Sequence, residues 1–143
     1  MQLLRLLLLL LSLVATSSLG MITPSPTTGP TTGAPNRLEI VRTPGINHTH
    51  VTHEMVITPH VVQTLYTHML TLPAAPDDQI CPTYIIAKYQ LTFSYNTKVI
   101  QKVNALNGEC QPVTLAPNDI RTADPAFWKL VKQATDLGTL LTH

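Results

Sequence analysis

Charge is scarce in this chain of 143 residues. Lysine, arginine, aspartate and glutamate together make up 12% of it, whereas a soluble domain usually carries about 25%. The chain has neither a basic surface that would attract nucleic acid nor an acidic one that would gather cations. We therefore expect no nucleic-acid partner, and the composition selects no other function.

Catalytic side chains are also few. Ser94 is the only serine in residues 37–143, and it lies in a regular alternating segment with no Gly-x-Ser-x-Gly pattern around it. Asp77 and Asp78 are adjacent, but they follow a proline-rich stretch in which solvated carboxylates are ordinary. No glycine-rich phosphate-binding loop occurs. Because no catalytic constellation is found, we expect neither an enzyme nor a bound cofactor.

Long hydrophobic runs are confined to the first 20 residues. Arg5 precedes about ten apolar residues and then a group of small ones, a pattern that is typical of a secretory signal peptide and too short to cross a bilayer core of about 30 Å. We predict cleavage between Ala15 and Met21, a secreted mature protein, and no transmembrane segment within it. Without Arg5 the basic and acidic residues balance, so the mature chain carries no net formal charge.

Residues 21–36 contain threonine, glycine and four prolines without hydrophobic periodicity. Such a composition cannot form a core, so we predict a disordered tether. The remaining residues, 37–143, are predicted to form a single domain.

The first half of this domain is predicted to contain two strands and a helix. Short strands are expected at Leu38–Arg42 and His50–Ile57. Thr58 and Pro59 form a helix start, and the helix should end before Pro73. One apolar face follows at helical spacing: Val61, Val62, Leu65, Tyr66 and Met69.

A hairpin is the clearest pattern in the chain. From residue 85 to 95 the odd positions are apolar, and the even positions from 88 to 94 are polar, which predicts a strand with one face in water. A two-residue loop after it would pair Leu91 with Lys102. A three-residue loop would pair Leu91 with Val103, and Tyr95 with Val99. The second keeps apolar partners on one face, so we predict the three-residue loop.

A fifth strand near Pro112–Leu115 and a last helix complete the domain. Asp124 is the expected helix cap, Pro125 the first helical residue, and Gly138 lies just past the end. The predicted fold is α+β, an antiparallel sheet of four to five strands with both helices packed on one face and one disulfide.

That disulfide joins Cys81 and Cys110, the only two cysteines. They flank the hairpin symmetrically in a chain predicted to be secreted, so folding the hairpin brings both to its open end. The pair is predicted to be structural.

Three further features are candidate sites. His48, His50 and His53 lie close in sequence, but a metal site would need another ligand, so we expect no metal. Asn47 begins an N-glycosylation tripeptide. Trp128 is a candidate contact for a partner, although covering the sheet edge is the favoured role.

Four segments of the chain resemble uncharacterised secreted bacterial proteins that carry a comparable domain behind a signal and a Thr/Pro tether: Cys81-Pro82, Tyr89–Phe93, Gly108–Cys110 and Asp124–Trp128. More loosely, the element order and the strand ending in Arg42–Gly45 are similar to those of emfourin-like inhibitors of thermolysin-type metalloproteases. This resemblance concerns topology and implies no particular inhibitory residue.

The sequence thus predicts a secreted, non-catalytic domain that binds an unknown protein partner. A protease-inhibitor-like module acting on a secreted protease is its more concrete form. The alternative is a small secreted protein that binds a metal or another ligand through His48, His50 and His53.

Overall fold

The computed structural model describes residues 33–45, 50–77, 81 and 84–140. The predicted signal peptide and residues 21–32 of the predicted tether lie outside them. The element order is β1 (Arg37–Pro44), β2 (Thr52–Val56), α2 (Pro59–Thr71), β3 (Ile85–Tyr95), β4 (Lys98–Gly108), β5 (Pro112–Ala116), β6 (Asp119–Thr122), α3 (Pro125–Leu137) and β7 (Thr139–Leu140).

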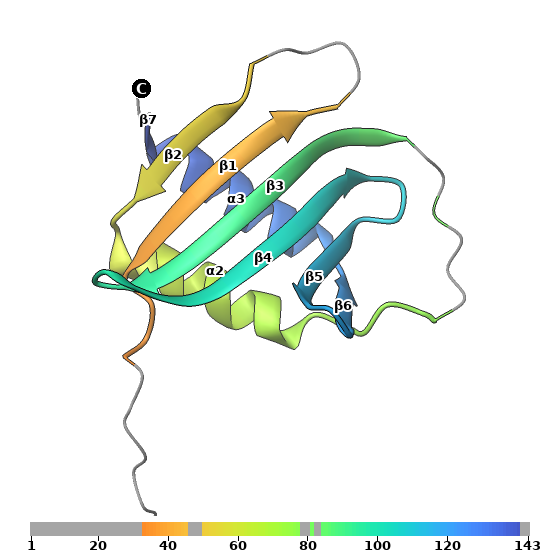
Figure 1. The fold of residues 1–143 in the computed structure, drawn as a ribbon, viewed down its shortest axis with the longest axis horizontal. Helices are drawn as coiled ribbons and strands as arrows, with labels where there is room; N and C mark the ends of the chain where they lie inside the picture. Colours follow the sequence, from red (N-terminus) through yellow and green to blue (C-terminus); the bar gives the residue numbers. More distant parts are fainter. Residues whose placement is uncertain (1–32, 46–49, 78–80, 82–83, 141–143) are drawn as a thin grey trace, which may run out of the picture. The chain divides into compact units, whose positions relative to one another are not determined.

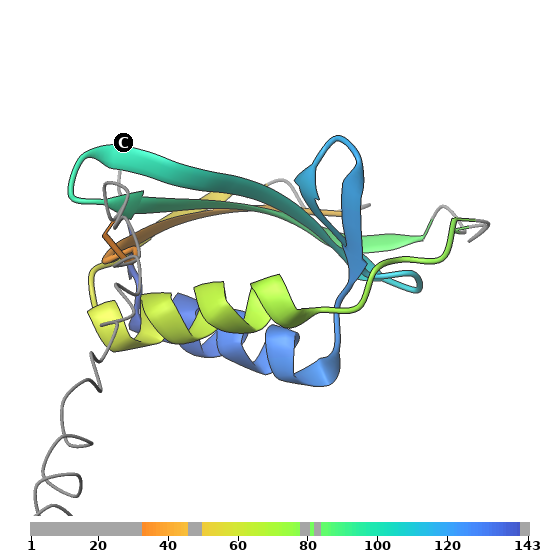
Figure 2. The ribbon, with the colours of Figure 1, turned by 90° about the horizontal axis from the view of Figure 1, so that it is seen from below.

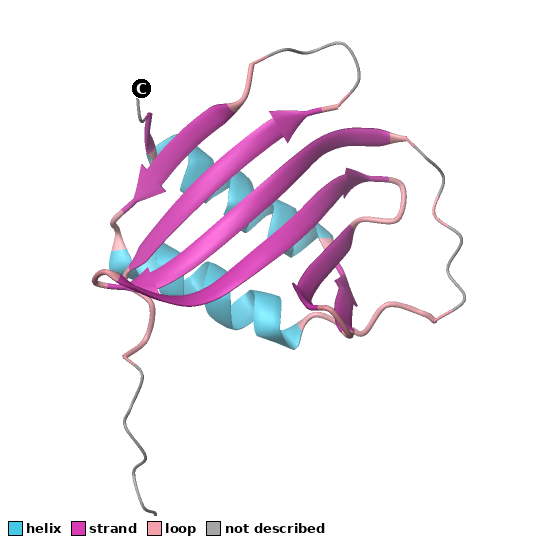
Figure 3. Cartoon of the chain, viewed as in Figure 1, coloured by secondary structure: helices cyan, strands magenta, loops and turns pink. Residues whose placement is uncertain are grey.

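The strands form one antiparallel sheet in the order β6-β5-β4-β3-β1-β2-β7, and α2 and α3 lie side by side on one of its faces (Figures 1 and 2). The predicted α+β class is confirmed. The predicted number of strands was too low, because the described residues form a sheet of seven. The two that were missed, β6 and β7, are four and two residues long, too short to show an alternating pattern (Figure 3).

The core lies between the sheet and the two helices, as the hydrophobic periodicity predicts. Phe93 from β3 and Phe127 from α3 are completely buried, and the Phe93 ring lies 5.1 Å from that of Tyr66 on α2. Burying apolar surface is the main stabilising contribution in such a layer. The other large, fully buried side chains are Leu38, Ile40, Leu65, Met69, Leu72, Leu91, Val56, Val62, Val103 and Val113.

The β3–β4 hairpin has a different turn from the predicted one. Tyr95 pairs with Lys98, so the turn is the two residues Asn96 and Thr97, and Asn96 adopts a left-handed φ of 53°, as tight hairpin turns require. The predicted pairing of Leu91 with Val103 is nevertheless correct. A bulge on β4 near residue 100 adds one residue and restores the apolar register.

The last residues of the segment assigned to the tether contact this turn. Asn36 donates a hydrogen bond from its side chain to Asn96 Oδ1 (3.0 Å) and accepts one from the Asn96 amide (2.9 Å). Its own amide donates to the Ser94 carbonyl. Asn36 therefore joins the start of β1 to the end of β3 and to the turn that follows it.

Gly138 ends α3 for a reason that differs from the expected one. Its φ of −66° is open to any residue, so left-handed backbone is not what favours glycine here. A Cβ atom at this position would lie 3.0 Å from Glu54 Cβ and 3.0 Å from Glu54 Oε2. The glycine allows the chain to pass closely over Glu54 before β7 pairs with β2.

Candidate functional site

A cleft of about 440 Å³ opens between α3 and one end of the sheet. We call it the α3 cleft. Side chains from four strands and from α3 line it: Arg42, Thr52, Glu54, Tyr89, Asn107, Trp128, Val131, Lys132 and Thr135.

Strand alternation places polar groups in this cleft. Leu38 and Ile40 point from β1 into the core, so Arg42 two residues further on shares their face. Val56 is fully buried on β2, and Glu54 shares its face in the same way. The inward stripe of each strand is thus apolar near the middle of the sheet and charged at this end.

Glu54 is the unusual member of the cleft. Its side chain is only 6% exposed, yet Oε2 has no hydrogen-bond partner. Burial raises the pKa of this carboxyl, Arg42 opposes that shift, and Asp136 adds to it. A buried carboxylate oxygen without a donor is destabilising. Titratable groups perturbed in this way and placed in a cleft are concentrated at functional sites, so Glu54 makes the α3 cleft a candidate binding site.

The other side of the cleft is aromatic and held in place. Arg42 Nε donates a hydrogen bond to the Tyr89 hydroxyl at 3.2 Å. The Tyr89 ring lies 5.5 Å from that of Trp128, whose indole N–H donates to Gln111 Oε1 at 2.8 Å. Trp128 is half-buried, so the structure shows it as a wall of the cleft.

A second polar contact joins the two helices. His68 Nε2 on α2 lies 2.9 Å and 3.1 Å from the two carboxylate oxygens of Asp124. The same carboxylate caps α3 by accepting a hydrogen bond from the Phe127 amide at 2.6 Å. On α2, the hydroxyls of Thr64 and Thr71 beside this pair bond to carbonyls of their own helix. The His68–Asp124 pair therefore acts as a link between α2 and the start of α3.

We predict that Asp124→Ala lowers the free energy of unfolding by about 1–2 kcal/mol, because it removes a helix cap and the contact with His68. Asp124→Asn keeps a capping oxygen and should lose less. His68 is the main cause of a lowered pKa of Asp124 in the fold. The contribution of the Asp124 carboxylate is therefore present above its unfolded pKa of about 3.9 and is lost as pH falls through its lower folded pKa.

Urea unfolding at pH 7 and pH 3 tests this prediction. The difference between wild type and Asp124→Asn should shrink at pH 3. Asp136→Asn is the matched control, because it removes a carboxylate whose hydrogen-bonded pair, with Lys132 on the same helix, is exposed and does not involve His68. Equal free energies of unfolding of wild type and Asp124→Ala at pH 7 would show that Asp124 neither caps α3 nor links it to α2.

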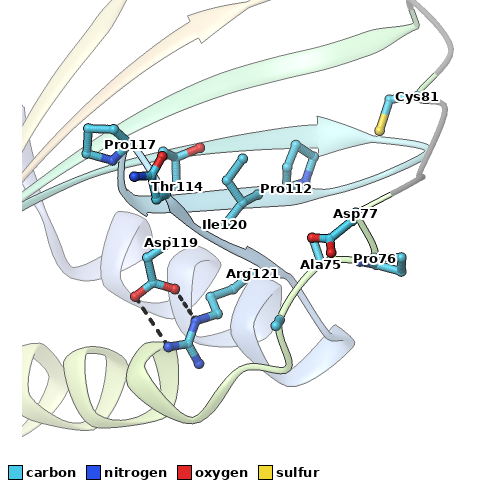
Figure 4. Close-up of a pocket in the computed structure, with 12 residues that line it drawn as sticks. Ala75, Pro76, Asp77, Cys81, Pro112, Thr114, Pro117, Asp119, Ile120 and Arg121 are labelled. Atoms are coloured by element: carbon cyan, nitrogen blue, oxygen red, sulfur yellow. Dashed lines mark hydrogen bonds and ion pairs between the residues drawn. The ribbon is translucent and has the colours of Figure 1, made fainter.

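A hollow of about 810 Å³ lies between residues 74–77 and the β5–β6 hairpin (Figure 4). Two of its charged side chains, Asp119 and Arg121, are paired with each other. Arg121 forms an ion pair with Asp119 and donates from Nη1 to the Leu72 carbonyl at 2.9 Å. These contacts fasten β6 to the end of α2, and we assign no ligand to this hollow.

The opposite face of the sheet carries a different kind of surface. A shallow hollow of about 360 Å³ lies near the start of β3, lined in part by Val41, Ile85 and Leu106. On either side of Ile85, the side chains of Tyr84 and Ile86 are 61% and 51% exposed. Neither of these two side chains lines the hollow itself. We call the three lining residues and these two neighbours at the start of β3 the outer patch.

Two glycines and the disulfide hold the outer patch in position. The Gly45 amide donates to the Ile86 carbonyl at 2.8 Å, and a Cβ atom on Gly45 would meet the Ile85 carbonyl. A Cβ atom on Gly108 would lie 2.5 Å from the Tyr84 carbonyl. Both neighbouring segments thus approach this backbone closely. The predicted disulfide between Cys81 and Cys110 is present, with Cα atoms 5.5 Å apart.

The histidines chosen from the sequence do not come together as a metal site in the described residues. His48 and the glycosylation candidate Asn47 lie outside those residues. His50 is exposed before β2, and His53 lies on β2 with the parity opposite to that of Glu54. Across the described part of the chain, no three His, Cys, Asp or Glu side chains are placed to share a metal ion.

Sequence reasoning missed the α3 cleft. The available signal was that Glu54 has the same strand parity as the core residue Val56, which predicts an inward carboxylate.

Comparisons with known protein families, with characterised proteins and with solved structures found no match for this chain. Within the described segments, neither helix has the length and apolar character needed to cross a bilayer.

Proposed function

We propose that this protein is a secreted, non-catalytic binding domain that docks another protein on the outer patch. The observation that carries the proposal is the exposure of Tyr84 and Ile86 beside a hollow, on backbone held by the nearby disulfide. A large aromatic and a β-branched residue at a fixed position are what a protein interface uses as anchors.

The low charge of the chain agrees with such an interface. Lys88 is a charged residue at the rim of the hollow, next to Gln90 and Asn104. An apolar centre with a polar rim is the common arrangement in protein–protein contacts. We therefore expect the partner to offer a small apolar group to the hollow and polar groups around it.

Protease inhibition is the more concrete form of this proposal. The strand end at Tyr84–Ile86 would enter the cleft of a secreted protease, and the disulfide would limit its mobility. A fixed backbone loses less conformational entropy on binding than a flexible loop does. The topological resemblance to emfourin-like inhibitors favours a metalloprotease as the target.

Affinity capture from the culture medium of the secreting organism tests the docking proposal. Wild type should retain a partner that Tyr84→Ser/Ile86→Ser binds at least about tenfold more weakly, since anchor residues commonly contribute more than 1 kcal/mol each. The control is Val99→Ser, because Val99 is 47% exposed near the turn at the other end of the hairpin. Equal binding by the double variant would refute docking on the outer patch.

A second measurement separates inhibition from simple docking. Purified protein is titrated against secreted metalloproteases at stoichiometric excess. Loss of protease activity with wild type, and not with the double variant, supports the inhibitor form. Unchanged activity overturns that form alone.

A further inference from the structure

The α3 cleft brings two opposite charges onto one face without letting them meet. Arg42 pairs with Thr52 across β1 and β2, and Glu54 lies two residues beyond Thr52 on the same face. Such diagonal neighbours have Cα atoms about 7–8 Å apart. No ion pair joins Arg42 to Glu54 among the described residues, so a gap separates an acidic group from a basic one.

Each of the two groups has unused bonding capacity. Glu54 Oε2 is buried and has no donor. Arg42 bonds to Tyr89 through Nε, and no contact of its two Nη atoms is recorded in the described residues. A guanidinium group with both Nη atoms available suits a carboxylate, whereas a buried carboxylate suits an ammonium group.

The rest of the cleft favours a ligand with an apolar part. Tyr89, Trp128 and Val131 provide an aromatic and aliphatic wall. The other cation in the lining, Lys132, is already paired with Asp136 at 2.6 Å. The volume of about 440 Å³ lies within the range of roughly 300–1,000 Å³ that is common for small-molecule sites.

We propose that the α3 cleft binds a free α-amino acid with an apolar side chain, its ammonium group on Glu54 and its carboxylate on Arg42. Its side chain would lie against Trp128. The ligand bridges the gap between the two charges and compensates the unpaired charge of the Glu54 carboxylate, which lines the cleft. This inference is independent of the proposed docking function, because none of the five outer-patch residues lines the α3 cleft.

Trp128 provides the readout, since it is the only tryptophan in the chain. Its fluorescence is followed while the purified full-length domain is titrated with leucine or phenylalanine. Isoamylamine, which is leucine without the carboxylate, and 4-methylpentanoate, which is leucine without the ammonium group, are the matched probes. We expect saturable binding of at least one of the two amino acids and at least tenfold weaker binding of both leucine analogues.

Two variants test the assigned roles. Glu54→Gln and Arg42→Gln should each weaken binding at least tenfold, whereas Glu39→Gln and Arg37→Gln, on the outward parity of β1, should leave it unchanged. Thermal unfolding shows whether the variants fold. Glu54→Gln should melt no lower than wild type, because it removes a charge that lacks a partner.

Three results would overturn the proposal. The first is no saturable signal with either amino acid at millimolar concentration. The second is equal leucine affinity in wild type and Glu54→Gln. The third is an amine analogue that binds as tightly as leucine, which would make the cleft a site for simple amines. None of these results bears on partner capture by the outer patch, so the two proposals fail separately.

Discussion

Phe93→Ala is expected to lower the free energy of unfolding by about 3–5 kcal/mol, the usual result of emptying a large buried aromatic site. Phe93 is fully buried on β3, pairs with Leu38 across to β1, and contacts the Tyr66 ring of α2. Its removal leaves a cavity between the sheet and the helix layer. Since small domains are stable by only about 5–15 kcal/mol, this single change removes a large share of the total.

Urea unfolding followed by circular dichroism measures this loss. The control is Tyr84→Ala. Tyr84 immediately precedes β3 and is 61% exposed, so its truncation should change the free energy of unfolding by less than about 0.5 kcal/mol. If the two variants lose the same amount, Phe93 is not part of the core that the structure shows.

Removing the disulfide is expected to lower the free energy of unfolding by about 3.6 kcal/mol for a loop of this length in the chain-entropy description. Cys81 and Cys110 are separated by 29 residues, and breaking the bond releases that loop in the unfolded chain. The Cα separation of 5.5 Å is in the ordinary range for a disulfide. Cys81→Ser/Cys110→Ser is the variant to compare with wild type.

Reduced wild type is the matched control for the serine substitutions. The double variant and the reduced protein should unfold at the same urea concentration, both well below the oxidised protein. Intact mass should increase by two hydrogens when the wild type is reduced. Identical unfolding of oxidised and reduced wild type would show that the bond adds no stability.

Local patterns predicted much of this fold because they report burial directly. The alternation from residue 85 to 95 identified β3. The Thr58-Pro59 and Asp124-Pro125 pairs marked the starts of α2 and α3, and Asp124 does accept a hydrogen bond from the Phe127 amide. The cysteine positions relative to the hairpin predicted the disulfide. Each of these signals depends on neighbouring residues or on a symmetric pair, so no knowledge of distant contacts was needed.

The hairpin turn shows where such reasoning stops. Matching apolar residues across β3 and β4 correctly paired Leu91 with Val103. It led to a three-residue loop because a regular ladder was assumed, whereas the structure combines a two-residue turn with a bulge on β4. A bulge has no reliable local pattern, because it depends on how the two strands fit the core.

The close approach of Gly138 to Glu54 and the burial of the Glu54 carboxylate depend on tertiary structure. The helix end at Gly138 could be read from the chain, but its close approach to Glu54 results from the pairing of β7 with β2. The parity of Glu54 indicated an inward side chain without showing what would cover it. The missing donor at Oε2 follows from the packing of α3 and β7 above it.

The chain's own residues thus decided the order of the two helices and the five longer strands, the inward stripes of the strands and the covalent link, because each follows from periodicity or from cysteine pairing. Only the folded structure decided the two short strands, the hairpin register at its turn, the outer patch and the α3 cleft. The physical reason is that surfaces and clefts are formed by residues far apart in sequence. Their bonding partners, or the lack of them, exist only after the sheet and helices have packed.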